Sequence, residues 1–210
     1  FESRYFGVSC DMTNSIKHQL YSDTLQAIEQ QNSVDEIFCQ YYDRVNNQDM
    51  LRKMLYVDTK IWLPDDLLTK ADKITMATSV ELRVPFLDHK FVEFTASIPS
   101  TLKIKGRTNK YIFKKAMKDI LPDTIIYRKK RGFPVPINQW FGTDLYTKAA
   151  DILLDRRTLQ RGYFNEDYLE KILHQQKNGQ ADHSRRIFSL ITLELWHQAF
   201  IDSRIHKING

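Results

Sequence analysis

The stretch LPDDLLTKADKITMATSVELRVPFLD, residues 63–88, decides what kind of fold this chain adopts. Its first half has the features of a helix start, because Pro64 fits the first helical position and the acidic Asp65 and Asp66 complement the positive end of a helix dipole. Apolar and small side chains then recur at helical spacing and predict one buried face, made of Leu67, Leu68, Ala71, Ile74 and Thr75. The first half is therefore predicted to be an amphipathic helix.

The second half, residues 80–87, breaks the helical pattern, because Pro85 disfavours helical backbone at the residue before it. Glu81, Arg83 and, just beyond, Asp88 stand here among apolar neighbours. A charge in such surroundings must reach solvent or pair with another charge. The residues by themselves favour a structural Glu–Arg or Arg–Asp ion pair that pins an extended segment.

The rest of the chain also has helical periodicity, and no set of strands is predicted. Capping residues predict where helices start: Ser33 with Glu36 in a capping box, Asn47, Asp88, Thr108 or Asn109, and Asn165. Helix ends are predicted at Pro99, Pro122 and Gly179. A last helix over about 182–202 is predicted to bury Ile187, Leu190, Ile191, Leu195 and Trp196. We therefore expect an all-α or nearly all-α body.

Composition excludes several classes of protein. The chain has 210 residues with 42% hydrophobic and 27% charged side chains, which fits a globular protein with one core or two small ones. It has no apolar run long enough for a transmembrane helix and no signal-peptide pattern at Phe1. Its two cysteines, Cys10 and Cys39, lie far apart, as reduced thiols of a cytosolic protein would. The histidines are scattered, so no metal site is expected.

Glycine usage excludes a phosphate-binding loop. The seven glycines include no Gly-Gly pair, and the chain has no GxGxxG, GKS or GKT motif. Loops that cradle phosphates need glycines so that backbone N–H groups can approach the anion. HExxH and GxSxG motifs are also missing.

Positive charge is concentrated in residues 103–131, where eleven Lys and Arg stand against two Asp, a net charge of 11 − 2 = +9 in a chain of net charge +5. Such a block can face nucleic acid, an anionic membrane or nucleotide phosphates. Its densest part, Arg128 to Arg131, precedes a glycine and two prolines that stiffen the loop. This run is either a solvated basic turn or a lysine aimed at a polyphosphate, with Lys110 as a second candidate.

Five segments in order carry a resemblance to a known family. They are LPDDLLTKADK at 63–73, SVELRVPFLDHKFVEF at 79–94, IPSTLKIKG at 98–106, KYIFKKA at 110–116 and LPDTIIYRKKRGFPVP at 121–136. In this order and at this spacing they resemble the C-terminal half of glutamine-hydrolysing asparagine synthetases, over roughly residues 56 to 141.

The resemblance implies a fold and a set of partners. Residues 1–210 would form a mainly α, bundle-like C-terminal portion of an adenine-nucleotide alpha-hydrolase-like (PP-loop) synthetase domain. The N-terminal glutaminase domain and the PP-loop core would be absent from residues 1–210, and as parts of the same polypeptide they would be its partners. The full-length enzyme would be cytoplasmic and use ATP, Mg²⁺, aspartate and glutamine to make asparagine, AMP and pyrophosphate. This portion would bind no cofactor and be inactive alone, and neither membrane nor nucleic acid is expected as a partner.

The resemblance also implies roles for individual residues. Lys130 matches the family lysine that reaches the phosphates during adenylation. Either Asp66 or Asp72 matches an acidic residue near the reacting centre, and the spacing leaves both open. Phosphate contacts are further implied for Lys110 and Arg128, and a structural motif that frames the site is implied for Glu81, Arg83, Pro85 and Asp88.

Two other functions remain open. The same synthetase fold also activates other carboxylates, in polysaccharide, peptide or β-lactam precursors, and the residues that read the substrate lie partly outside this chain. The second alternative is a non-catalytic basic helical module that binds nucleic acid through residues 103–131. Its cations flank apolar helix residues and do not interleave with stacking aromatics, which argues against it.

Overall fold

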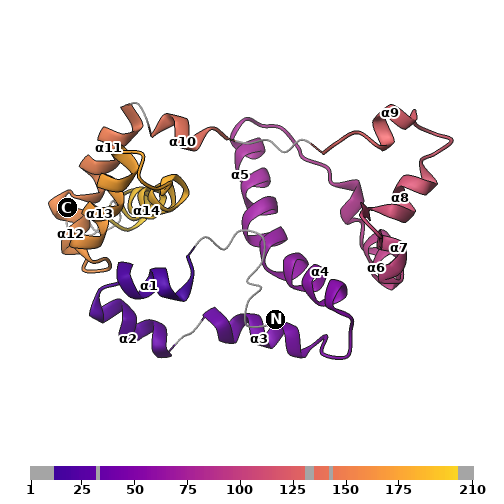
Figure 1. The fold of residues 1–210 in the computed structure, drawn as a ribbon, viewed down its shortest axis with the longest axis horizontal. Coiled ribbons are helices and arrows are strands. Elements are labelled where there is room, and N and C mark those ends of the chain that lie inside the picture. The colour runs from indigo at the N-terminus through magenta and orange to yellow at the C-terminus, as the bar shows by residue number, and fades with distance from the viewer. Residues whose placement is uncertain (1–11, 32–33, 131–134, 142–143, 203–210) are drawn as a thin grey trace. The chain divides into compact units, whose positions relative to one another are not determined.

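A computed structural model describes residues 12–31, 34–130, 135–141 and 144–202, and these residues are mainly helical, as predicted (Figure 1). Their only regular strands are β1 (Ile104–Lys105) and β2 (Thr108–Asn109), which pair antiparallel. The chain divides into a first unit, residues 1–9 and 34–132, and a second unit, residues 10–33 and 133–210. None of the described helices has both the length and the apolar character needed to span a bilayer.

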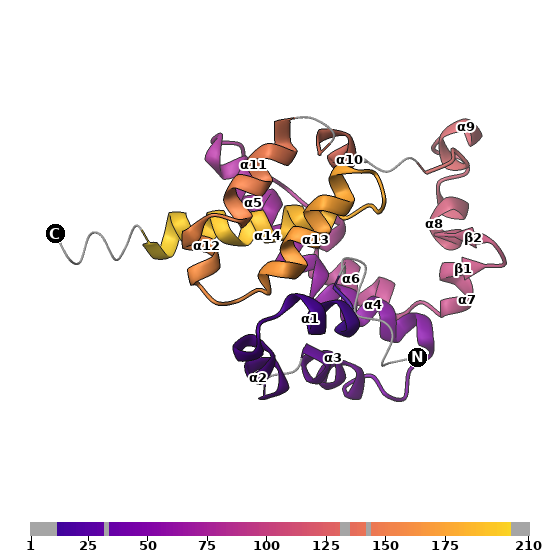
Figure 2. The same ribbon diagram turned by 60° about the vertical axis from the view of Figure 1, so that its left-hand side comes forward.

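The second unit is an assembly of helices from both ends of the chain. In sequence order they are α1 (Asn14–Leu20), α2 (Asp23–Gln31), α10 (Ile137–Trp140), α11 (Asp144–Leu153), α12 (Arg156–Gln160), α13 (Glu166–Lys177), α14 (Ser184–Trp196) and the π-helix η3 (His197–Asp202). Backbone hydrogen bonds join the early helices to the loop before α13, from Asn165 N–H to the Leu20 carbonyl (2.8 Å) and from Ser22 N–H to the Tyr163 carbonyl (2.9 Å). Figure 2 shows α1 beside α13.

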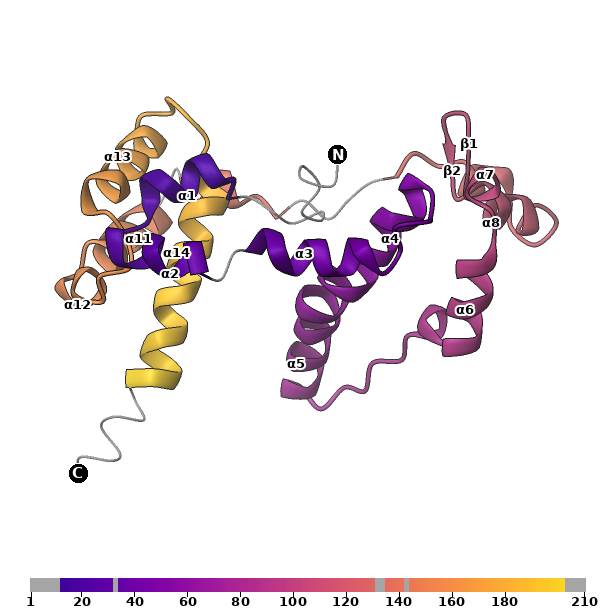
Figure 3. The same ribbon diagram turned by 90° about the horizontal axis from the view of Figure 1, so that it is seen from below.

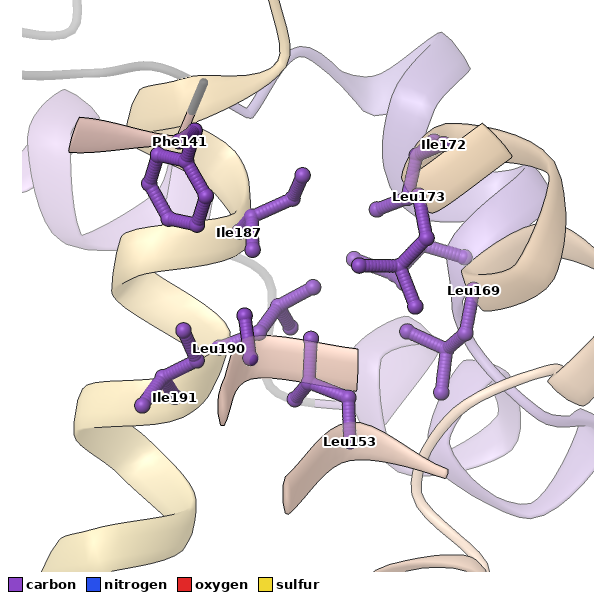
Figure 4. Packing of buried hydrophobic residues seen from close by; sticks show 10 residues of the cluster. Phe141, Leu153, Leu169, Ile172, Leu173, Ile187, Leu190 and Ile191 are labelled. Carbon is purple, nitrogen blue, oxygen red and sulfur yellow. The ribbon is translucent and has the colours of Figure 1, made fainter. Parts of the chain in front are cut away.

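A compact apolar core holds the second unit together. Side chains from α11, α13 and α14 point toward one another, among them Leu153, Leu169, Leu173, Ile187 and Leu190 (Figure 4). Each of these five is at most 2% exposed. Full burial of a side chain of this size stabilises the folded state by about 1.5–3 kcal/mol, so this cluster is a sufficient reason for the unit to fold.

The predicted ends of α13 are confirmed. The Asn165 side chain accepts a hydrogen bond from the Tyr168 N–H at 3.0 Å, as an N-cap does. At the other end Gly179 has φ of +64°, a backbone conformation that side chains with a Cβ rarely adopt. The N–H groups of Gly179 and Gln180 bond back to the carbonyls of Gln176 and Gln175, the pattern of a Schellman motif.

The buried face of α14 differs from the prediction. Ile187, Leu190 and Ile191 are buried as expected, but Leu195 and Trp196 are each 47% exposed, and Glu194, 3% exposed, takes the inner position. A buried carboxylate requires a cation, and Arg161 at the end of α12 supplies it. The prediction was wrong because the helical spacing of apolar residues within α14 contains no information about Arg161, which lies 33 residues before Glu194 in the chain.

Arg161 binds two carboxylates at once. Its Nε lies 2.6 Å from Glu194 Oε2, and its Nη2 lies 2.7 Å from Asp202 Oδ2. The wide π turn of η3 absorbs one extra residue, which brings Asp202 round to the side of the helix that carries Glu194. Burial would raise the pKa of Glu194, but hydrogen bonds from Arg161 and Gln198 outweigh it and lower that pKa.

Replacing Arg161 with Ala should destabilise the second unit by about 3 kcal/mol, because it leaves Glu194 buried without its counter-charge. Urea unfolding followed by tryptophan fluorescence measures this, since Trp140 and Trp196 lie in this unit. Arg156→Ala, an exposed site on the same helix, is the matched control and should change the unfolding free energy by at most about 0.5 kcal/mol. Equal effects of the two substitutions would contradict the role given to Arg161.

The first unit contains α3 (Val34–Asp43), α4 (Met50–Lys60), the π-helix η1 (Leu63–Leu68), α5 (Thr69–Ala77), the 3₁₀ turn η2 (Pro85–Leu87), α6 (His89–Ser97), α7 (Ser100–Lys103), the β1–β2 hairpin, α8 (Tyr111–Ala116) and α9 (Asp123–Ile126). Figure 3 shows the hairpin next to α7 and α8. A small core of Phe38, Tyr42 and Val57 joins α3 to α4.

Two of the predicted helix starts in the first unit are wrong. Asp49, not Asn47, caps α4 and accepts the Arg52 N–H at 3.1 Å. Thr108 and Asn109 form β2, because their backbone pairs with β1, and α8 begins only after Lys110. The predicted cap at Asp88 is confirmed, since it accepts the Phe91 N–H at 3.1 Å. Ser33, predicted to cap α3, lies outside the described residues.

No residue from 58 to 125, all of which the structure describes, is buried. The predicted buried face is therefore only partly buried within the described chain: Leu67, Leu68, Ala71 and Thr75 are half-buried, and Ile74 is 62% exposed. Phe94 and Ile120 are more exposed still, at 64% and 69%. An apolar surface of this extent on a folded protein marks a surface that another part or partner covers.

Limited digestion of the purified chain with trypsin should cut first between residues 60 and 130. This region has few buried contacts to resist local unfolding, whereas residues 144–202 surround a core. Mass spectrometry of fragments sampled over time measures the order of cleavage. Cleavage within 144–202 at equal or earlier times would contradict the assigned difference in stability.

Candidate functional site

The predicted acidic residues lie on one helical run formed by α4, η1 and α5, of which α4 and α5 are labelled in Figure 1. Asp66 lies in the π turn of η1, and both oxygens of its carboxylate have partners. Trp62 donates its indole N–H to Oδ2 at 3.0 Å, and the Lys70 ammonium donates to Oδ1 at 3.1 Å. These partners lie four residues before and four after it, so Asp66 joins the two ends of the π turn.

Asp72 has a different environment. It lies on α5, is exposed, and its carboxylate has no hydrogen-bond or ion-pair partner among the residues described. The six positions between them, partly in the π turn of η1 and partly in α5, are not a whole number of turns of either helix type. The carboxylates of Asp66 and Asp72 therefore leave the helix in different directions. The structure therefore separates the two candidates, one held by neighbours and one available to a ligand.

The motif at 80–88 contains the ion pair favoured from its residues. Arg83 Nη2 lies 2.6 Å from Glu81 Oε1, with 82% and 70% of these side chains exposed. A pair this exposed contributes little to stability, so it does not by itself pin the segment. Pro85 starts the turn η2, and Asp88 uses its carboxylate to cap α6. Their role in framing a site stays a prediction.

An aromatic cluster joins this motif to the basic part of the unit. The Phe86 ring meets Phe91 of α6 and Phe113 of α8 edge to face, with ring centroids 5.7 and 5.8 Å away. Such arrangements are favourable beyond the area that they bury. The cluster therefore sets where η2 and α8 lie relative to each other.

The predicted phosphate-binding cations are exposed and have no carboxylate partner among the residues that the structure describes. Lys110 precedes α8 in the left-handed conformation, with φ of +52°. Lys105 Nζ lies 4.9 Å from the Tyr111 ring centroid, and Lys114 donates to the Asn109 side chain at 3.5 Å. Within the described part of the basic block, residues 103–130, no Lys or Arg forms an ion pair with a carboxylate of the described chain.

Arg128 and Lys130 follow α9 and are both exposed. The rest of the predicted loop, residues 131–134, lies outside the described residues. The structure places these cations in the same unit as Asp66 and Asp72. Among the residues described, no hydrogen bond or ion pair joins Lys130 to either acid, so the candidates share a unit without forming a closed site.

Two polar arrangements were not predicted. The contacts of Trp62 and Lys70 with Asp66 could have been predicted from the sequence, because both pairs have the i, i+4 spacing of neighbours on a helix. The second is a hydrogen-bond pair between Asp49 and Ser100, which are 51 residues apart and give no sequence signal. In the described part of the chain, no three His, Cys, Asp or Glu side chains gather in a way that would hold a metal ion.

Comparison with known proteins gives concordant matches. A family model described as asparagine synthase matches residues 3–198. The chain is 35% identical to asparagine synthetase [glutamine-hydrolyzing] 1 of Bacillus subtilis over 206 residues, 97% of this chain and 31% of that protein. It is 35% identical over 105 residues to asparagine synthetase of Gallus gallus, 46% of this chain and 19% of that protein. No solved structure matches.

A further relative has a different name. The amidase chyE of Penicillium rubens is 30% identical over 115 residues, 51% of this chain and 17% of that protein. The chain thus spans less than a third of the length of each of these relatives.

Proposed function

Because the chain belongs to the asparagine synthase family, we propose that it supplies the helical part of an ATP-dependent ligase. In the proposed reaction a carboxylate attacks the α-phosphorus of ATP and releases pyrophosphate. Ammonia from glutamine then attacks the acyl carbon and displaces AMP. Aspartate is the proposed acceptor, which gives asparagine. The observation that carries this proposal is the set of unpaired cations that the structure presents in the unit that also holds Asp66 and Asp72.

The cations suit an ATP-binding role. Charge grows on the phosphate oxygens as pyrophosphate leaves, and a positioned ammonium stabilises that charge. Lys130 is the residue proposed for this, with Arg128 and Lys110 as further phosphate contacts. A lysine already held by a carboxylate would have to give up that partner first, and these three have none within the described chain.

ATP and Mg²⁺ differ in how well the described residues fit them. The cations of residues 103–130 are suited to a polyphosphate. Mg²⁺ prefers oxygen ligands in octahedral geometry and is commonly held by one or two carboxylates with the substrate phosphates. In the described chain no group of three His, Cys, Asp or Glu side chains could hold a metal ion, and we assign Mg²⁺ no protein ligand here.

The exposed apolar surface of residues 58–125 supports a partner from the same polypeptide. The chain spans 31% of the length of the Bacillus subtilis relative. We propose that the nucleotide-binding core and a glutaminase domain make up much of the remainder, and that the core covers this surface. The chain by itself would then have no turnover, because it lacks a phosphate loop. We place the full-length protein in the cytoplasm and propose neither a membrane nor a nucleic-acid partner.

The acceptor is the open part of the proposal. Relatives named asparagine synthetase favour aspartate. The relative with the different name, amidase, leaves the alternative open, which is another carboxylate in a polysaccharide, peptide or β-lactam precursor. All of these acceptors share the adenylation step. An assay of that step therefore tests the mechanism and the acceptor together.

ATP–pyrophosphate exchange by the full-length protein should be stimulated by aspartate and not by glutamate, succinate or a diaminodicarboxylate. The measurement is incorporation of labelled pyrophosphate into ATP with each acid in turn. Residues 1–210 alone serve as the blank and should show no exchange. Exchange with a different acid would move the protein to the alternative acceptor class, and no exchange with any acid would overturn the adenylation proposal.

Lys130→Ala in the full-length protein should lower ATP-dependent amide formation by at least about 100-fold, as loss of a donor that stabilises transition-state charge does. Glutamine hydrolysis should be retained. Lys129→Ala is the matched control, since it removes the same charge one residue away, and it should stay within a few-fold of the wild-type rate. Equal loss in both variants would show that only the overall charge of the turn matters.

A further inference from the structure

A polar junction links the start of α4 to the turn between α6 and α7. The Ser100 hydroxyl lies 2.8 Å from each carboxylate oxygen of Asp49. Arg52, one turn into α4, donates through Nη2 to the carbonyls of Ser97 (3.2 Å) and Ile98 (3.4 Å) at the end of α6. We call these contacts of Asp49, Arg52 and Ser100 the 49–100 junction.

The junction closes a long loop of chain. Asp49 and Ser100 are 51 residues apart, and the chain between them includes α4, η1, α5, the extended motif and α6. Asp66 and Asp72 therefore lie inside the closed loop. Immediately after the junction the chain continues into the hairpin, α8 and α9, which lead to Lys110 and Lys130.

Few other forces fix this geometry. No residue between 58 and 125 is buried, so the described chain does not hold α6 and α7 on α4 through an apolar core. Directed hydrogen bonds from or to a charged group are stronger and geometrically more specific than those between neutral groups. In this segment the hydrogen bonds therefore fix the orientation of α6 and α7 relative to α4, which apolar packing does not fix.

The environment of Asp49 keeps its carboxylate ionised. The hydrogen bond from Ser100, followed by the backbone N–H of Arg52, lowers the pKa of Asp49. Lys103 lies close by, and burial, followed by the charge of Arg52, lowers its pKa. The junction thus brings two cationic side chains of different elements around one carboxylate.

From this geometry we propose that the 49–100 junction is a positioning device, which sets where the cation-bearing segment after Ser100 lies relative to the acid-bearing helix of Asp66 and Asp72. The inference rests on the proposed function for its effect on catalysis. Asp49 and Ser100 are positioning residues and touch no reactant.

The junction does more than cap a helix. Asp88 and Asp155 also cap helices, through the N–H groups of Phe91 and Arg157. Only Asp49, of these three, is seen to add a hydrogen bond from a distant element. Replacing Ser100 therefore separates the two roles of Asp49, because it removes the long-range bonds to Asp49. The cap bond from Arg52 N–H and the Arg52 bonds to the Ser97 and Ile98 carbonyls stay in place.

The test uses Ser100→Ala in the full-length protein. Carboxylate-stimulated ATP–pyrophosphate exchange should fall roughly 10- to 100-fold, the scale of effect of a small misplacement of reacting groups. Ser100→Thr keeps a hydroxyl on the β-carbon and should restore most of the rate. Ser97→Ala is the matched control, because the Ser97 hydroxyl bonds only the nearby Phe94 carbonyl, and it should behave as wild type.

A second readout does not depend on the proposed function. Hydrogen exchange of the backbone amides of residues 100–116 should accelerate in Ser100→Ala, while residues 166–196 keep their wild-type rates. Two results would overturn the positioning role. One is hydrogen exchange at residues 100–116 that stays as slow in Ser100→Ala as in the wild type, and the other is a wild-type rate of ATP–pyrophosphate exchange in that variant. So would a loss shared by Ser97→Ala or not rescued by Ser100→Thr. If the wild-type protein shows no ATP–pyrophosphate exchange, the proposed function is contradicted. Hydrogen exchange of the backbone amides would still test whether the 49–100 junction positions residues 100–116.

Discussion

No apolar side chain of residues 58–125 is fully buried within the described chain, and this constraint shapes the first unit. Helices with one apolar face are stable when that face is buried. Here Ile74, Phe94 and Ile120 are all more than half exposed. The surface they belong to follows the part of the sequence that resembles asparagine synthetases. Under the proposed function this surface packs on a nucleotide-binding core, and the same segment carries the residues that reach the nucleotide.

In the second unit, by contrast, the apolar side chains are buried in a core. Leu169, Ile187 and Leu190 meet in a closed core, and the buried carboxylate of Glu194 is matched by Arg161. A buried carboxylate with a bidentate arginine is costly to disturb on either side. This unit therefore has the means to be a stable support. The first unit carries the candidate residues on elements that polar contacts join and that no fully buried apolar core holds.

Charge is arranged in the first unit in a way that suits a phosphate ligand. Within the described chain the cations of residues 103–130 have no carboxylate partner, while Asp66 is held at both oxygens and Asp72 is left open. Because these charges are exposed to solvent, leaving them unpaired costs the unit little stability. Under the proposed function they stay available to a ligand that carries an anionic polyphosphate.

By itself the sequence determined the helical class, the ends of α13 and the cap at Asp88, because these depend on residues within a few positions of each other. The Glu81–Arg83 pair was readable for the same reason. Only the tertiary structure decided that Glu194 takes the buried place expected for Leu195, because its partner Arg161 is 33 residues away. It also decided that Asp49 rather than Asn47 caps α4 and that Ser100 reaches it. These outcomes depend on which distant groups meet in space, and no local pattern of apolar and polar residues records that.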